Sequence, residues 1–226
     1  MKIEELGIQG VHLVRPQVFD DPRGAFLELF VGHRLSAQTG RRMDVAQVNC
    51  SVSRHGTIRG IHLTATPPGE AKYVTCVSGS IIDVVVDVRT GSPTYGASLA
   101  IPLDDTQHHA LYIAEGLGHG FAAVSDTAVV TYLCDNTYTP GQTISINPLD
   151  PQLALPWPDL DDIVLSDKDR TAPTLAQAEA LGILPHYTTP HAPARPAGQR
   201  PALHKWHKVT QEQPAHRHQE QDQEHS

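Results

Sequence analysis

The sequence predicts an all-β fold, an antiparallel jelly-roll barrel, and three observations support this. Short β-branched runs recur between residues 1 and 187, and Gly, Pro and Asp interrupt them every ~8 to 12 residues, as in sandwiches and barrels. Helical periodicity is weak in most of this region. A jelly roll also limits exposed sheet edges in a chain with many short strands. We therefore expect one barrel domain, residues 1–187, within the chain of 226 residues.

Four runs give the clearest predicted strands, and turn signals rich in Gly and Pro separate them. They are residues 45–52, 72–77, 81–88 and 128–134. In the third run, Asp83, Val85 and Asp87 fall on one face, and aliphatic side chains fall on the other. One face of this strand is expected to pack against a sheet, and the other to meet something polar.

A short C-terminal helix is predicted over residues 172–181, because Pro173 lies near its start and Gly182 just past its end. From Thr188 to Ser226 the composition shifts to Pro, Gln and His without apolar periodicity. Such a segment cannot bury enough apolar surface to offset its ordering entropy. Residues 188–226 are therefore predicted to be a disordered tail.

Charge and hydropathy exclude several classes of protein. The net charge of −8, with His neutral, argues against a nucleic-acid binder that neutralises phosphates over a broad basic surface. No stretch approaches the ~20 apolar residues of a membrane span, and the N-terminus lacks the pattern of a signal peptide, so a cytoplasmic protein is expected. The three cysteines have no CxxC spacing, which indicates neither a disulfide framework nor a thiolate zinc site.

Polar side chains occupy alternate positions in several predicted strands, where an inert barrel would carry Val or Thr. Each of them alone is more typical of a structural residue. Together, on several strands, they indicate a polar barrel interior that holds a ligand. They are Gln47, Asn49, Arg59, Lys72 and Tyr132.

The histidine spacing does not predict a metal site, and no cofactor motif is present. A metal-binding cupin barrel would usually offer HxH, but Gly60 stands two positions before His62, and His119 matches only the second half of such a pattern. There is no GxGxxG and no Walker-type loop. His62, Lys72 and Tyr132 can instead supply a base, an enolate-stabilising cation and an acid for cofactor-free proton transfer next to a carbonyl.

Eight motifs, in order along the chain, carry a specific resemblance. They are residues 19–24, 47–49, 58–62, 71–74, 83–89, 91–96, 118–121 and 165–169. Over about residues 3–187 the chain resembles the dTDP-4-dehydrorhamnose 3,5-epimerase family. The resemblance implies a cupin-type jelly-roll barrel without metal or cofactor. It also implies a homodimer whose substrate is dTDP-4-dehydro-6-deoxyglucose or a close relative, with no nucleic-acid or membrane partner.

The resemblance also implies a role for each matching residue. His62 would be the base, Asp169 would hold its tautomer, Tyr132 would be the acid on the opposite face of the sugar, and Lys72 would stabilise the C4 enolate. The remaining matches would line the site or bind the dTDP part, with an aromatic ring stacked on the thymine. They are Arg23, Glu28, Gln47, Asn49, Arg59, His119 and Lys168, and the aromatic Tyr138.

Departures from the family pattern leave the regiochemistry open. Leu63 and Thr64 stand where the family often has an aromatic residue and Gln, Thr143 stands where Glu often follows the Tyr-x-Pro turn, and residues 66–74 resemble the antibiotic deoxysugar branch. Members of that branch invert C3, C5 or both, so rhamnose and antibiotic-sugar pathways are both open. A metal-dependent cupin enzyme and a non-catalytic sugar-binding cupin remain as alternatives from other classes. Tyr132 speaks against the latter, because binding alone needs no acid.

Overall fold

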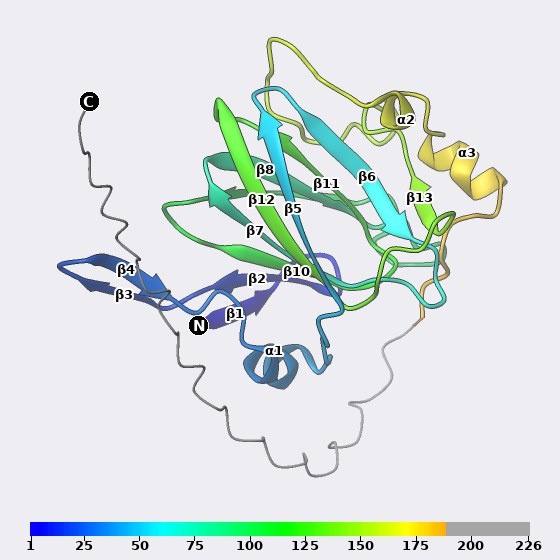
Figure 1. Cartoon of the computed structure of the whole chain (residues 1–226). Coiled ribbons are helices and arrows are strands. Elements are labelled where there is room, and N and C mark those ends of the chain that lie inside the picture. The colour runs from blue at the N-terminus through cyan, green and yellow to red at the C-terminus, as the bar shows by residue number, and fades with distance from the viewer. Residues whose placement is uncertain (189–226) are drawn as a thin grey trace, which may run out of the picture. The chain divides into compact units, whose positions relative to one another are not determined.

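The computed structural model describes residues 1–188, in which two antiparallel β-sheets face each other as a jelly roll (Figure 1). One sheet has the strand order β1-β2-β10-β7-β12-β5, and the other has the order β13-β6-β11-β8-β9. The strands of the first sheet are β1 (Lys2–Glu5), β2 (Val11–Arg15), β10 (Ala110–Ile113), β7 (Lys72–Ser78), β12 (Thr127–Cys134) and β5 (Gln47–Arg54). Those of the second are β13 (Thr143–Ser145), β6 (Ile58–Thr64), β11 (Gly118–Ala123), β8 (Ser80–Val86) and β9 (Ser98–Asp104). The predicted all-β jelly roll is confirmed.

All four clearest predicted strands are present, as β5, β7, β8 and β12, with ends that differ by up to two residues. The predicted C-terminal helix is α3 (Leu175–Ala180), which is shorter than expected because Thr174 caps its start in a capping box with Gln177. Two further helices were not predicted, α1 (Gly32–Thr39) and α2 (Asp167–Arg170). Each is too short for a clear apolar period.

Strand β8 separates two parts of the hydrophobic core. Ile81 and Val85 pack between the sheets, whereas Val84 and Val86 pack against the C-terminal segment that carries α3. Asp83 is fully buried on the barrel side of this strand, where it meets a histidine. Asp83 meets a polar partner as predicted, but Val85 on the same face packs between the sheets, and the aliphatic face packs against the C-terminal segment.

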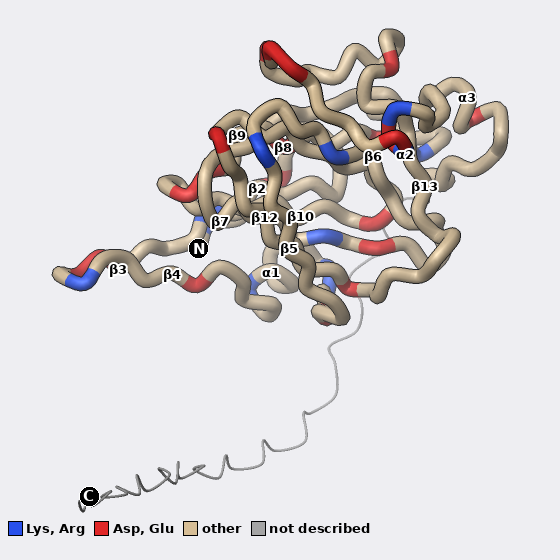
Figure 2. Tube along the Cα trace, turned by 45° about the horizontal axis from the view of Figure 1, so that its top comes forward, with Lys and Arg blue, Asp and Glu red and all other residues tan. Residues whose placement is uncertain are grey.

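A third, two-stranded sheet projects from the body of the barrel (Figure 1). It is the hairpin of β3 (Val18–Asp21) and β4 (Gly24–Leu27), in which nearly every residue is exposed. Phe19 and Phe26 stack on it with ring centroids 6.4 Å apart, although both rings are open to solvent. Its tip carries neighbouring basic and acidic groups (Figure 2). An isolated hairpin of this kind is marginally stable in water.

The predicted tail lies outside the described residues, apart from Thr188 at its start. Within residues 1–188, no helix is long and apolar enough to cross a membrane.

Candidate active site

Two adjoining cavities lie in the barrel, with volumes of about 580 and 310 Å³, in the range of small-molecule sites. The larger cavity is bordered by residues of β5, β6, β7, β11 and β12, so both sheets contribute to its wall. Three side chains border both cavities and mark their junction. They are His62, Lys72 and Tyr132.

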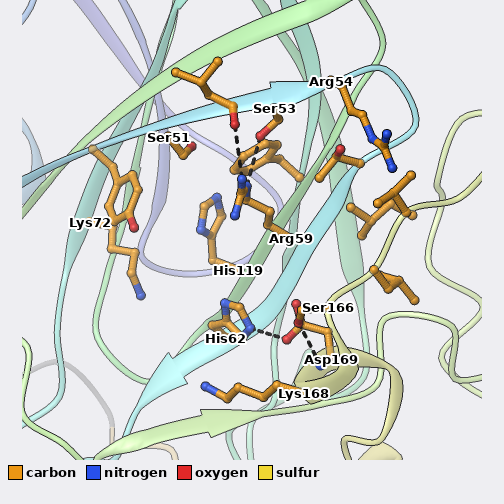
Figure 3. Close-up of a pocket in the computed structure, with 17 residues that line it drawn as sticks. Ser51, Ser53, Arg54, Arg59, His62, Lys72, His119, Ser166, Lys168 and Asp169 are labelled. Atoms are coloured by element: carbon orange, nitrogen blue, oxygen red, sulfur yellow. Dashed lines mark hydrogen bonds and ion pairs between the residues drawn. The ribbon is translucent and has the colours of Figure 1, made fainter.

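His62 forms the shortest polar contact at this junction. Its Nε2 lies 2.6 Å from Oδ1 of Asp169, and Figure 3 shows the two side chains directed toward each other. Asp169 comes from α2, a helix whose N-cap residue Ser166 accepts a hydrogen bond from the Asp169 backbone N–H at 3.1 Å. An ionised carboxylate only accepts hydrogen bonds, so Nε2 of His62 carries the proton and Nδ1 keeps a free lone pair.

The Asp169 carboxyl is held in its ionised form. Burial by itself would raise its pKa, but the hydrogen bond and charge of His62, together with Ser166, bring the pKa below its usual value of 3.8. A carboxylate that accepts from one ring nitrogen fixes the tautomer of the imidazole. The arrangement can therefore accept a proton at Nδ1.

Close approach of β6 and β11 sets a second histidine beside the first. Gly60 has a φ of +126°, and a Cβ at this position would lie 2.5 Å from the Cα of Gly120, so only glycine fits there. In this register His119 lies directly opposite His62. Nε2 of His119 lies 2.8 Å from Oδ2 of Asp83, which is fully buried. Two histidine–aspartate pairs thus lie on neighbouring strands.

Lys72 and Tyr132 face His62 from the opposite sheet. Tyr132 lies on β12 and Lys72 on the neighbouring strand β7. Burial, together with the negative charge of Glu70, raises the pKa of Tyr132, and Arg59 opposes the shift. Tyr132 therefore keeps its proton at neutral pH. Lys72 Nζ lies 3.1 Å from a carboxylate oxygen of Glu70.

Arg59 is anchored along the wall of the larger cavity. Its Nε donates to Oγ of Ser53 at 3.0 Å, and its Nη2 donates to the backbone carbonyl of Val52 at 3.2 Å. These bonds use part of the five N–H donors of the guanidinium, so the others remain for an anionic ligand. Lys168 borders the same cavity from α2.

The smaller cavity carries the predicted amide and aromatic residues. Gln47 Nε2 donates to Oδ1 of Asn49 at 2.7 Å, and Gln47 Oε1 accepts the backbone N–H of Tyr138 at 2.8 Å. Asn49 also donates to the buried thiol of Cys134 at 3.7 Å. Gln47 thus ties the loop that bears the largely exposed Tyr138 ring to β5.

Arg23 and Glu28 do not border either cavity of their own chain. Arg23 lies at the tip of the projecting hairpin, where its side chain is 89% exposed and pairs with Asp21. Glu28 follows the hairpin and pairs with Arg34 at 2.8 Å. All the other predicted site residues border one or both cavities.

Sequence reasoning missed several residues of the site. Asp83 was seen as part of a polar strand face but not as the partner of His119. Glu70 precedes Lys72 by two positions and was not singled out, although this spacing places both side chains on one side of an extended chain. Ser51 and Ser166 also border the larger cavity, and Oγ of Ser51 is buried without a hydrogen-bond partner. Hydroxyls of this kind give no sequence signal of their own.

Among the side chains of residues 1–188, no group of three or more His, Cys, Asp and Glu residues is placed to hold a metal ion.

Comparison with known proteins shows which family this chain is similar to. Residues 5–177 match the family model described as dTDP-4-dehydrorhamnose 3,5-epimerase. A dTDP-4-dehydrorhamnose 3,5-epimerase of Streptomyces griseus is 50% identical over 182 residues, which cover 80% of this chain and 90% of that protein.

Two solved structures are similar in both sequence and fold. A 4-keto-6-deoxy sugar epimerase from the novobiocin gene cluster of Streptomyces spheroides aligns with a TM-score of 0.81 at 48% identity, covering 83% of this chain and 94% of that one. A 3'-monoepimerase of Streptomyces bikiniensis, in complex with dTDP-quinovose, aligns with a TM-score of 0.78 at 47% identity, covering 80% and 92%.

Proposed function

The chain belongs to the dTDP-4-dehydrorhamnose 3,5-epimerase family, and from this we propose that it epimerises dTDP-4-dehydro-6-deoxy-D-glucose at C3, C5 or both. It is an isomerase, and its proposed pathway is either dTDP-L-rhamnose or antibiotic deoxysugar biosynthesis. The observation that carries the proposal is the junction of the two cavities. There a histidine on one sheet, paired with an aspartate from α2, faces a protonated tyrosine on the other sheet.

The first step is removal of a proton next to the C4 ketone. The proposed base is Nδ1 of His62, because the hydrogen bond to Asp169 engages Nε2 and leaves Nδ1 free. The Asp169 carboxylate stabilises the imidazolium that forms when the ring takes up the proton. The electron pair of the broken C–H bond moves into the enolate, whose oxygen is at C4.

The Lys72 ammonium group is proposed to stabilise that enolate oxygen. It borders both cavities, so it is next to any sugar that reaches His62. A positive group aimed at the atom where negative charge develops lowers the barrier to proton removal.

The second step returns a proton to the same carbon from the opposite face. Tyr132 is proposed as the acid, since its raised pKa keeps the hydroxyl protonated and it comes from the sheet opposite His62. An acid and a base on opposite sides of the carbon give inversion, whereas one group acting alone would return the proton to its original face.

The nucleotide part is proposed to extend from this junction along polar groups of both cavities. Arg59 and Lys168 carry the positive charge that a diphosphate needs, and Gln47 and Asn49 supply amide groups. The exposed ring of Tyr138 offers a stacking surface for thymine. His119 contributes a polar wall beside the sugar.

We also propose that the protein acts as a homodimer in which the hairpin of each copy reaches its partner's cavity. Two observations support this. Phe19, Phe26 and Arg23 are exposed on a projecting hairpin, and Arg23 matches a family position at the site while it lies apart from the cavities of its own chain. Arg23→Ala should then raise the KM about tenfold or more, while kcat changes little and the protein stays a dimer. A monomeric wild type by analytical ultracentrifugation would contradict this part of the proposal.

The function is tested by incubating the protein with dTDP-4-dehydro-6-deoxyglucose in D2O and following C3 and C5 by NMR. We expect deuterium and inversion at one or both carbons, which also settles the regiochemistry. Wild-type protein that binds dTDP but exchanges neither proton would be a sugar-binding barrel instead. Loss of exchange after EDTA treatment, with recovery on adding a transition metal, would favour the metal-dependent alternative.

A further inference from the structure

We propose that Glu70 is a positioning residue of this site. Its carboxylate fixes the position of the Lys72 ammonium group and favours the protonated form of the Tyr132 hydroxyl. The inference rests on the proposed function, because it assigns Glu70 to the stabilisation of the enolate and to the return of the proton. The first observation is location, since Glu70 borders the smaller cavity together with Lys72 and Tyr132.

The Glu70–Lys72 pair is sheltered from solvent. Nζ and Oε1 lie 3.1 Å apart, and each side chain is 12% exposed. Water screens such a pair weakly, in contrast to the exposed Arg15–Glu4 pair on the first two strands. A lysine has a long flexible stem, so an ammonium group without a fixed counter-charge would sample many positions. The carboxylate of Glu70 selects one of them.

The backbone on each side of Glu70 is held in place. The carbonyl of Gly69 accepts a hydrogen bond from Nδ2 of Asn136 at 3.3 Å, and the N–H of Ala71 donates to Oδ1 of Asp135 at 2.7 Å. Asn136 and Asp135 directly follow β12, the strand of Tyr132. The anchoring therefore fixes the Glu70 carboxylate relative to the strand that bears the proposed acid.

Gly69 adds a steric reason for this placement. Its φ is +75°, and a Cβ at this position would lie 2.8 Å from Cβ of Glu115. Glu115 is itself paired with Arg41 at 2.5 Å. The chain therefore turns toward the cavity at a position where only glycine fits.

The charge of Glu70 also acts on Tyr132. Burial is the largest cause of the raised pKa of Tyr132, and the negative charge of Glu70 adds to it, whereas Arg59 opposes it. Replacing Glu70 by Gln removes one of the charges that favour the protonated phenol. Glu70 also contributes to the raised pKa values of Cys134 and Asp135. The other titratable or charged groups near this junction are Arg54, Arg59, His62, Lys72, His119, Tyr138, Lys168 and Asp169.

The sign of the expected pH effect follows from this. An inversion rate that needs protonated Tyr132 falls as pH rises through the pKa of that group. Because Glu70→Gln lowers this pKa, the alkaline limb of the rate profile should move to lower pH, by about half a pH unit. A residue that only supported the fold would lower the rate without moving the limb.

The test compares Glu70→Gln, Glu70→Asp and a matched control, Glu4→Gln, in the same inversion assay from pH 6 to about 11.5, so that the range extends past the raised pKa of Tyr132. Glu4 lies in the exposed pair with Arg15, so Glu4→Gln makes the same chemical change away from the site. For Glu70→Gln we expect kcat to fall about tenfold with little change in KM, since positioning is lost and binding is kept. Glu70→Asp keeps the charge, so its alkaline limb should stay at the wild-type pH. Glu4→Gln should match the wild type.

A double-variant cycle with Lys72→Met tests whether Glu70 acts through Lys72. On the Lys72→Met background, Glu70→Gln should lower kcat less than twofold, because there is no ammonium group left to position. If the wild type inverts no carbon, the proposed function itself fails. If the wild type inverts normally but Glu70→Gln keeps both kcat and the limb, or lowers kcat equally on both backgrounds, the role of Glu70 is wrong. Should Glu70→Gln not fold, Glu70→Asp takes its place in the cycle with Lys72→Met, and an equal fall of kcat on both backgrounds would contradict the role of Glu70.

Discussion

The two histidine–aspartate pairs of the barrel have the same chemistry but different access to the cavity. The His62 side chain is 34% exposed and its partner Asp169 comes from a helix at the rim, whereas the His119 side chain is 10% exposed and Asp83 lies fully buried on the next strand. Both rings bond to their carboxylate through Nε2. The difference teaches that access of the free ring nitrogen to the cavity, not the pair itself, selects the base.

The same difference predicts that the fold depends more on His119 than on His62. Asp83 has one oxygen on His119 and its other oxygen, Oδ1, buried without a partner. Removing His119 would leave a buried carboxylate with no counterpart, which is costly in a barrel interior. Asp169, on helix α2, has further support from Ser166, so the fold depends less on His62.

The largest effect is expected when His62 is replaced. His62→Asn should lower the rates of proton exchange and inversion by about 10⁴-fold, because Asn cannot accept the proton that Nδ1 takes. The free energy of unfolding should change by no more than about 1 kcal/mol, because the Asn amide can still donate to Asp169 and Ser166 also supports that carboxylate. Deuterium wash-in followed by NMR, with dTDP binding by calorimetry as the control, measures both properties. Exchange at a near wild-type rate would remove His62 from the mechanism.

Replacing His119 should act on stability instead. His119→Leu should lower the free energy of unfolding by about 3 to 5 kcal/mol, the usual cost of leaving one buried charge unpaired. Urea unfolding monitored by fluorescence measures this. The double variant with Asp83→Leu should recover much of the loss, because apolar residues of similar size can replace a buried pair. A loss below about 1 kcal/mol for the single variant would contradict the claim that Asp83, without His119, destabilises the fold.

A smaller effect is expected on the pH dependence of stability, through the pair of His62 and Asp169. The folded-state pKa of Asp169 lies below its usual value, so its contribution to stability is present above that usual value of 3.8 and is lost as pH falls through the lower folded value. Asp169→Asn should therefore cost about 1 kcal/mol of unfolding free energy at pH 6 to 7, and almost nothing in strongly acidic solution. A stability difference between wild type and variant that grows toward acid pH would contradict the assigned direction.

The strand pattern predicted the fold and the polar side chains that border the two cavities. Alternation in β-branched runs assigned Gln47, Asn49, Lys72 and Tyr132 to the barrel interior, since an inert strand would carry apolar residues at those positions. The same rule placed Asp83 on a polar face. These inferences need only local sequence, because side-chain direction in a strand follows from the period of two.

Contacts that depend on the tertiary arrangement could not be predicted from the sequence. The pairing of Asp83 with His119 depends on the register of β8 and β11, which the sequence of either strand does not encode by itself. The role of Glu70 depends on the turn at Gly69. Arg23 shows the same limit, since its motif matches a family position while its hairpin lies apart from the cavities of its own chain.

The central claim, that base and acid act from opposite sheets, is tested most directly by Tyr132→Phe. The change removes one hydroxyl and keeps the ring, so packing should be preserved. We expect deuterium wash-in at C3 or C5 to continue, because His62 can return a proton to the face it came from, while inversion falls by about 10² to 10⁴-fold. Incubation of this variant in D2O, with NMR of exchange and stereochemistry on one sample, separates the two rates. Inversion at the wild-type rate would contradict the two-sheet mechanism and require another acid in the barrel.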